Sequence, residues 1–291
     1  GIAIINTGFK ILNTALFLPL SGVLEKLVCK LIPDSKDAEE DTELDERLLF
    51  TPTLALQQCS LKEIEMARRA AQALKNSIKS ITEYTPELAE SIKEDEQRCD
   101  RYEDMLATYL VKIGSERLAD SDSEEANMLL KLLGDFERIS DHAVNLLESA
   151  EEMRDKKIVF SPEAAHDFSI ISSAVNEILD FSMEAFINND RAKAGDVEPL
   201  EQVIDEMKEN MRTSHVLRMR NGECSMEMGF VWSDILTNFE RVSDHCSNIA
   251  GCVIDAAEHN LNLHETLGNF KHNSKAFEER YKYYSEKYSK I

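Results

Sequence analysis

The 291-residue chain is poor in the residues that interrupt regular structure, since it contains only 10 glycines and 6 prolines. Average proteins hold about 7% glycine and about 5% proline, so few turns are expected over this length. A fold of many short strands and a glycine-rich doubly wound fold are therefore disfavoured. The sequence instead predicts long α-helices.

Basic residues are also scarce, because 33 Lys and Arg stand against 55 Asp and Glu and give a net charge of -22. No run rich in Lys or Arg offsets the repulsion that such a chain meets at nucleic-acid phosphates. We therefore expect no nucleic-acid partner.

The cysteines lack any C-x-x-C spacing, which disfavours a zinc ribbon or a redox dithiol. Their scatter also differs from a disulfide framework, so we expect reduced and mostly buried thiols in a cytosolic domain. The six are Cys29, Cys59, Cys99, Cys224, Cys246 and Cys252.

An apolar stretch opens the chain, from Ile2 to Leu24, and has about the length of a membrane-spanning helix. Lys26 and Lys30 follow it, as expected of a cytoplasmic flank. It lacks the charged start and the cleavage site of a signal peptide. We therefore predict that residues 1–33 are the end of a membrane domain; the alternative is an apolar helix that packs on the rest of the chain.

Residues 34–50 are predicted to form a solvated acidic linker, because eight of the first thirteen are acids. Six long helical patterns follow, separated by turn residues. We place them at 53–83, 86–115, 122–155, 162–189, 192–220 and 225–258. The C-terminal tail, 261–291, is predicted to be a further helix lying against the body.

A heptapeptide occurs twice: FERISDH begins at Phe136, and FERVSDH begins at Phe239, 103 residues later. A period near 100 with three helices in each period indicates tandem three-helix units. The fold prediction is therefore all-α, with two tandem three-helix repeats forming an elongated helical bundle. Repeat one spans 51–158 and repeat two spans 159–260.

Each repeat also carries two Glu-x-x-x-Asp pairs, whose members lie on one helix face about 6 Å apart. All four pairs flank the apolar stripe on the same side, and their levels match along each helical hairpin. We therefore expect four carboxylates to converge in each repeat, where they repel one another unless a cation lies between them. The pairs are Glu96/Asp100 and Glu137/Asp141 in repeat one, and Glu201/Asp205 and Glu240/Asp244 in repeat two.

Oxygen ligands favour hard cations such as Mg, Ca, Mn or Fe, and Zn also accepts carboxylates. In the alternative interpretation, Arg138 and Arg241 neutralise the acids as salt bridges. His142 and His245 point away from the acids on the helical wheel, so we expect them to form inter-helix hydrogen bonds.

The doubled sequence E-R-[I/V]-S-D-H-x-x-N resembles the signature of the PhoU family of phosphate-signalling accessory proteins, over about residues 50–260. The resemblance implies a PhoU-like domain at 51–260 with a regulatory, non-catalytic function. It also implies iron or zinc clusters at the eight acids of the four pairs, with Asn145 and Asn248 as secondary candidates.

Residues 13–33 and the tail from His264 resemble the last membrane helix and the end of bacterial sodium/phosphate symporters. In those proteins a PhoU-like domain follows the membrane part. The resemblance implies that a transporter domain of the same polypeptide handles phosphate and sodium, with residues 51–260 at the cytoplasmic face of the bacterial cell membrane. Whether the chain forms a homo-oligomer is left open by the sequence.

Two other functions also stay open on the residues alone. A carboxylate-bridged di-metal enzyme needs two Glu-x-x-His motifs, and only Glu163 with His166 fits that spacing. A structural rod is the other alternative, because three-helix units of this length also build rods. We predict no catalytic residue.

Overall fold

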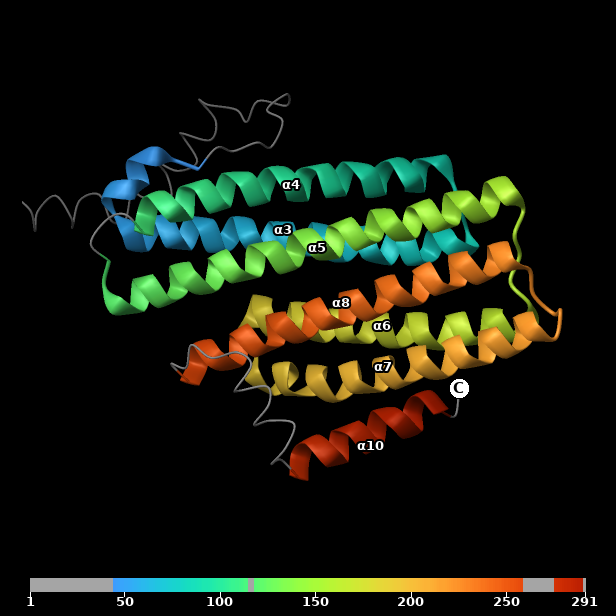
Figure 1. The fold of residues 1–291 in the computed structure, drawn as a ribbon. Coiled ribbons are helices and arrows are strands. Elements are labelled where there is room, and N and C mark those ends of the chain that lie inside the picture. The colour runs from blue at the N-terminus through green and yellow to red at the C-terminus, as the bar shows by residue number, and fades with distance from the viewer. Residues whose placement is uncertain (1–43, 115–117, 259–274, 290–291) are drawn as a thin grey trace, which may run out of the picture. The chain divides into compact units, whose positions relative to one another are not determined.

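The computed structural model of the chain describes residues 44–114, 118–258 and 275–289 (Figure 1). Within these ranges the chain forms seven α-helices, one 3-10 helix and no strand, which confirms the all-α prediction for this part. The elements are η1 (Glu46–Phe50), α3 (Pro52–Thr82), α4 (Pro86–Gly114), α5 (Asp120–Lys156), α6 (Pro162–Asn188), α7 (Arg191–Arg220), α8 (Met226–Glu258) and α10 (Lys275–Ser289).

The expected membrane segment, residues 1–33, lies outside the described residues. Among the helices that are described, none has the length and apolar character needed to cross a bilayer.

The helices form two groups of three. Helices α3, α4 and α5 pack against one another, and so do α6, α7 and α8 (Figure 1). Contact between the groups is made mainly by α5 with α8, and α3 also touches α6. Phe136 on α5 and Phe239 on α8 are both fully buried, as expected of equivalent core positions.

The helix boundaries follow from capping residues. The Thr85 hydroxyl accepts a hydrogen bond from Leu88 N, and the Ser161 hydroxyl accepts one from Ala164 N, so these residues cap the starts of α4 and α6. Lys157 and Asn189 have positive φ angles of 55° and 50° just after α5 and α6. Left-handed residues end helices in this way, so turns that usually take glycine are made here without it.

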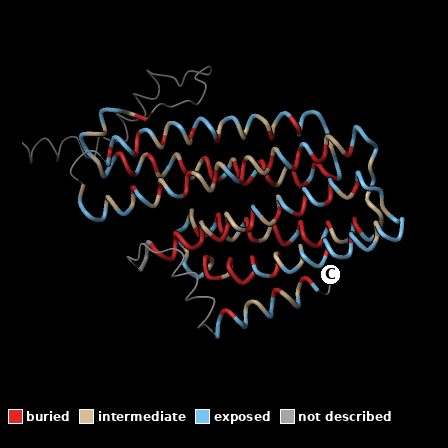
Figure 2. Tube along the Cα trace, viewed as in Figure 1, coloured by how far each residue is buried: buried red, intermediate tan, exposed pale blue. Residues whose placement is uncertain are grey.

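Buried residues recur at intervals along each helix, with exposed residues between them (Figure 2). This pattern is what a 3.6-residue period produces on an amphipathic helix. The described cysteines fit the expectation of unpaired thiols: Cys59, Cys99, Cys246 and Cys252 are buried, and Cys224 is half-buried.

Two histidines lie at the contact between the repeats. The rings of His142 and His245 have centroids 5.7 Å apart. His142 Nδ1 is 2.8 Å from Asn238 Oδ1, and His245 Nδ1 is 2.9 Å from Asp135 Oδ1. Asp135 and Asn238 are themselves 103 residues apart, so the two bonds are related by the repeat. The expected inter-helix hydrogen bonds are confirmed.

Both ends of the described chain pack against this body. Lys275–Ser289 forms α10, which contacts α7, and the Tyr281 hydroxyl donates to Glu206 at 2.6 Å. At the other end, residues 46–50 form a 3-10 helix, although they fall in the predicted linker. The difference has a local cause: Leu44 is buried, and Tyr109 donates a hydrogen bond to the Asp45 carbonyl.

Candidate metal centre

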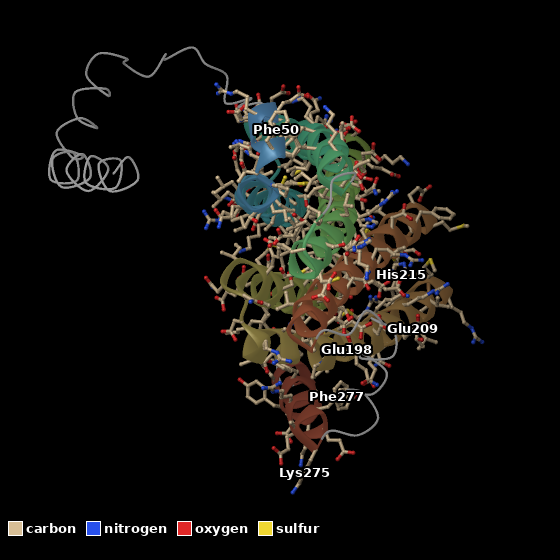
Figure 3. All side chains as sticks on the ribbon, turned by 90° about the vertical axis from the view of Figure 1, so that its left-hand side faces the viewer. Phe50, Glu198, Glu209, His215, Lys275 and Phe277 are labelled. Atoms are coloured by element: carbon tan, nitrogen blue, oxygen red, sulfur yellow. The ribbon has the colours of Figure 1, made fainter. Side chains whose placement is uncertain are left out.

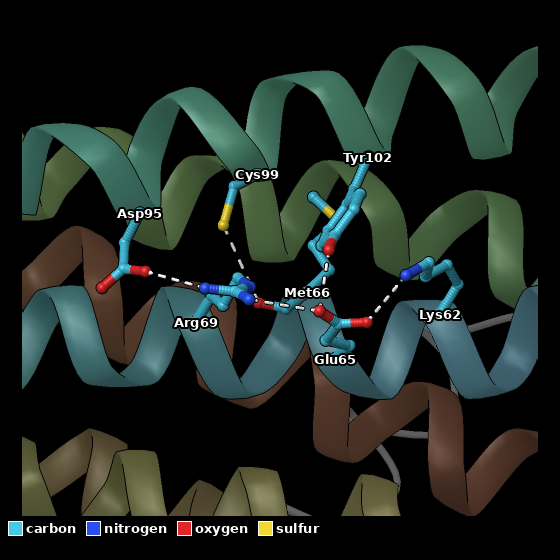
Figure 4. A network of polar contacts seen from close by, with 7 residues as sticks. All are labelled: Lys62, Glu65, Met66, Arg69, Asp95, Cys99 and Tyr102. Atoms are coloured by element: carbon cyan, nitrogen blue, oxygen red, sulfur yellow. Dashed lines mark hydrogen bonds and ion pairs between the residues drawn. The ribbon is translucent and has the colours of Figure 1, made fainter. Parts of the chain in front are cut away.

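Polar contacts between α3 and α4 set the orientation of α4 (Figure 4). The Tyr102 hydroxyl donates to Glu65 at 2.7 Å, and Arg69 on α3 bridges Glu65 and Asp95 at 3.2 and 3.3 Å. The Cys99 thiol points to the Met66 carbonyl at 3.8 Å. Asp95, Cys99 and Tyr102 of α4 thus contact α3. Glu96 and Asp100 lie on the neighbouring face of α4, which is turned towards α5.

Three acids of repeat one come together between α4 and α5. Glu96, Asp100 and Asp141 each offer a carboxylate oxygen, and the three oxygens lie within 4.8 Å of one another. Glu96 and Asp141 are half-buried, and Asp100 is exposed. The predicted convergence is therefore observed for three of the four acids of this repeat.

The fourth acid, Glu137, sits beside Asp141 on α5. Burial, the neighbouring Asp141 and Glu103 raise the pKa of Glu137 to about 7. Burial and like charges also raise the pKa values of Glu96 and Asp100. The site thus holds excess negative charge that a bound cation would offset.

Arg138 supplies part of the countercharge, as the salt-bridge alternative expects. Its guanidinium lies 3.4 Å from both Glu137 and Asp141, but the arginine side chain is 61% exposed. Water screens a pair of this kind, so it balances the acids only weakly. The upward pKa shift at Glu137 persists in its presence.

Repeat two holds its acids differently. Lys208 Nζ on α7 lies 2.6 Å from Glu240 Oε1, and Arg241 lies 3.5 Å from Asp244. Glu201 is buried and Asp205 is half-buried on α7. Among the described residues, no set of three potential ligands other than Glu96, Asp100 and Asp141 meets at one point. The two repeats, expected to carry equal clusters, are therefore unequal.

A charge reversal between the repeats accompanies this difference. Glu96 and Asp100 align with Glu201 and Asp205 at an offset of 105, and the same offset aligns Glu103 with Lys208. Repeat one has an acid facing Glu137 where repeat two has a lysine paired to Glu240. Sequence reasoning missed Lys208 because it compared only the acids; extending the same offset by three residues reveals it.

Of the two secondary candidates, Asn248 lies at the contact between the repeats and Asn145 is exposed on α5. The Asn248 amide donates to Asp135 Oδ1 at 3.1 Å, beside His245. The Asn145 carbonyl accepts from the Ser149 hydroxyl within α5. Asn248 thus has a structural partner, and its participation in a metal site stays a prediction, as does that of Asn145.

Comparison with known proteins gives a match to a family model described as "PhoU domain", at residues 64–150 and 168–253. Each matched range falls within one repeat. A Thermotoga maritima protein named phosphate-specific transport system accessory protein PhoU homolog 1 is 31% identical over 126 residues, 43% of this chain and 53% of that protein. The chain therefore aligns with only about half the length of this relative.

A Zymomonas mobilis phosphate-specific transport system accessory protein PhoU homolog is 25% identical over 195 residues, 66% of this chain and 81% of that protein. Two crystal structures share the fold. PhoU from Pseudomonas aeruginosa has a TM-score of 0.65 at 20% identity, covering 73% of this chain and 100% of its own. The phosphate transport system regulatory protein PhoU from Streptococcus pneumoniae has a TM-score of 0.64 at 15% identity, covering 72% of this chain and 99% of its own.

Proposed function

The chain belongs to the PhoU domain family, and on that premise we propose that it is a regulatory accessory protein of phosphate transport that catalyses no reaction itself. The observation that carries the proposal is the family match over both repeats. The names of the two curated relatives, both accessory proteins of a phosphate-specific transport system, support it.

The finer proposal concerns the transporter. The likeness of residues 13–33 and of the C-terminal tail to sodium/phosphate symporters favours a sodium-coupled membrane domain in the same polypeptide. That domain would handle phosphate and sodium, and the two repeats would act at the cytoplasmic face of the cell membrane.

A metal ion is the third part of the proposal. Glu96, Asp100 and Asp141 would bind one cation in repeat one, with Glu137 as a further ligand. Three carboxylate oxygens within 4.8 Å fit a hard cation such as Mg, Ca, Mn or Fe, and Zn is also compatible. In repeat two, Lys208 would take the place of the cation as the countercharge to Glu240.

Phosphate uptake in the source organism tests the regulatory function. The segment encoding residues 51–260 is deleted in frame, and uptake of radiolabelled phosphate is followed in phosphate-rich and phosphate-poor medium, with and without sodium. We expect uptake in the deletion strain to lose its dependence on phosphate supply, and the wild-type segment to restore it. Unchanged regulation would refute the function, and regulation of a sodium-independent uptake would refute only the symporter.

A further inference from the structure

A groove lies between the C-terminal half of α7 and the first turns of α8, and it encloses a cavity of about 380 Å³. Its walls are apolar: Val216 and Met219 come from α7, and Met226 and Phe230 come from α8. Val216, Met226 and Phe230 are 52%, 71% and 65% exposed. Large apolar side chains this exposed and this close together mark a surface suited to binding another molecule.

The floor of the groove carries two buried hydrogen-bonding groups. Trp232 is 1% exposed and His215 is 4% exposed, and both line the cavity. Figure 3 labels His215 on the molecule. Trp232 Nε1 and His215 Nδ1 have no hydrogen-bond partner among the described residues. Buried polar atoms without partners are costly to the fold.

A glycine keeps this floor open. A Cβ at Gly229 would lie 2.6 Å from Met219 Sδ and 3.2 Å from His215 Nε2. The absent side chain lets α8 approach α7 closely while His215 stays at the base of the groove.

The rim of the groove is basic, although the whole chain has a net charge of -22. Arg212 lines it together with Lys208, which is paired to Glu240, and none of the lining residues is an Asp or Glu. Arg220 follows at the end of α7, where Arg218 is paired to Asp167. The groove therefore favours a ligand of negative charge.

Repeat one provides an internal comparison for each of these features. At offsets of 105 on the middle helix and 103 on the third helix, Lys208 and Arg212 correspond to Glu103 and Ala107. Met226 and Phe230 correspond to Ser123 and Asn127. The three-helix unit thus folds with no basic or large apolar residue at these four positions, so the basic and apolar groove is not a requirement of the fold.

The same helix already accepts an amphipathic helix elsewhere. Helix α10 contacts α7, with Arg280 paired to Asp196 and Tyr281 bonded to Glu206. There, basic and aromatic residues of the added helix meet acids of α7. In the groove the charge of α7 is reversed.

We propose that the groove binds an acidic amphipathic helix of a partner protein. Apolar side chains of that helix would cover Met226 and Phe230, and its carboxylates would face Arg212, the helix-in-groove mode of recognition. This inference rests on the proposed regulatory function, because a regulator of transport acts by contacting another protein.

Trp232 is the only tryptophan of the chain and serves as the reporter. The full chain is titrated with a synthetic 18-residue peptide that carries Leu and Phe on one helical face and Glu on its flanks. We expect a saturable change in Trp232 emission that weakens with salt. A peptide with Lys in place of every Glu should cause no such change.

Variants locate the binding. Met226→Ser combined with Phe230→Asn introduces the residues of repeat one and should weaken peptide binding about tenfold. Arg212→Ala should weaken it about threefold and reduce its salt dependence. The matched control is Val111→Asn, at the α4 position equivalent to Val216; Val111 is 64% exposed, and the substitution should leave binding unchanged.

Several results would overturn the proposal: no saturable change with the acidic peptide, equal binding of its Lys twin, or equal binding by the double variant with its helix content intact. Binding of vesicles containing phosphatidylglycerol in preference to the peptide would assign the groove to a membrane. A dimer that dissociates in the double variant would assign it to a second copy. Peptide binding is measured on purified protein, so its failure is separate from failure of the uptake assay.

Discussion

Lys208 Nζ lies 2.6 Å from Glu240 Oε1, at the position where the other repeat has Glu103 facing Glu137. The two repeats therefore differ in the charge of one residue beside their paired acids, which is Glu103 in repeat one and Lys208 in repeat two. In repeat two the Lys208 ammonium balances Glu240. In repeat one Glu96, Asp100 and Asp141 lie close together, and the exposed Arg138 pairs with Asp141.

Reversing that charge tests whether the lysine replaces a metal. Lys208→Glu should lower the free energy of unfolding by about 2 kcal/mol in the presence of a chelator, because it breaks a partly buried pair and adds a like charge. Added Mn, Fe or Zn should restore part of the loss, as measured by thermal unfolding. Lys282→Glu, an exposed site with the same charge change, should show neither effect; an equal loss there would refute the assignment.

Glu63 should lower the stability of the protein at neutral pH. Its side chain is fully buried, and neither carboxyl oxygen has a hydrogen-bond partner among the described residues. Burial raises its pKa well above 4.5. The stability that protonated Glu63 gives is therefore fully present below the pKa of Glu63 in the unfolded chain. It is lost as pH rises through the pKa of Glu63 in the folded state.

Glu63→Gln should remove this loss and stabilise the protein at pH 7 by about 1–2 kcal/mol. The measurement is thermal unfolding of both proteins at pH 4 and pH 7. Glu90→Gln, at an exposed position of α4, is the control. A variant that is less stable than wild type at pH 7 would show that the carboxylate is needed.

The contact between the repeats should show energetic coupling between His142 and Asn238. Their 2.8 Å bond joins α5 to α8. A double-mutant cycle with His142→Ala and Asn238→Ala should give a coupling energy of about 1 kcal/mol, measured by denaturant unfolding. The cycle of exposed His166 with Asn238 should give none; the same value in both cycles would contradict a direct interaction.

Burial of His142 lowers its pKa. The stability that depends on neutral His142 is present above the unfolded pKa of about 6.5 and is lost as pH falls through the folded value. The free energy of unfolding should therefore fall more between pH 7 and pH 5 in wild type than in His142→Ala.

Deleting residues 1–33 should leave the helical body folded. Residues 44–291 form a compact unit of their own, with the core drawn from α3 to α8 and α10. The midpoint of thermal unfolding, followed by circular dichroism, should change by less than about 3 °C. Unfolding of the truncated protein would show that the segment belongs to the core and is not a membrane element.

The fold could be predicted from the sequence because the patterns that indicate it are local and occur in both repeats. Scarce glycine and proline predicted long helices, and the heptapeptides at Phe136 and Phe239 marked equivalent core positions. The η1 helix was not predicted because the many acids around Asp45 are typical of a solvated linker. The burial of Leu44, which holds this segment on the body, is a tertiary contact that the local sequence does not show.

The candidate site could be predicted only in part from the sequence. Helical spacing places Glu96 and Asp100 on one face, but whether acids on two helices meet depends on every side chain that reaches the same gap. Lys208 reaches it from one turn beyond Asp205, and a search for acid pairs alone ignores that residue. The groove at Trp232 depended on tertiary packing, since His215 and Gly229 come together only when α7 lies against α8.

The most direct test of the account is the metal content of two variants with the same chemical change at equivalent positions. Wild type, Asp141→Asn and Asp244→Asn are equilibrated with Fe, Zn, Mn, Mg or Ca, freed of excess ion, and analysed by plasma mass spectrometry. The account predicts about one bound cation in wild type and in Asp244→Asn, and a loss of about tenfold or more in affinity in Asp141→Asn. Equal loss in both variants, or no bound cation in wild type with any of the five metals, would contradict it.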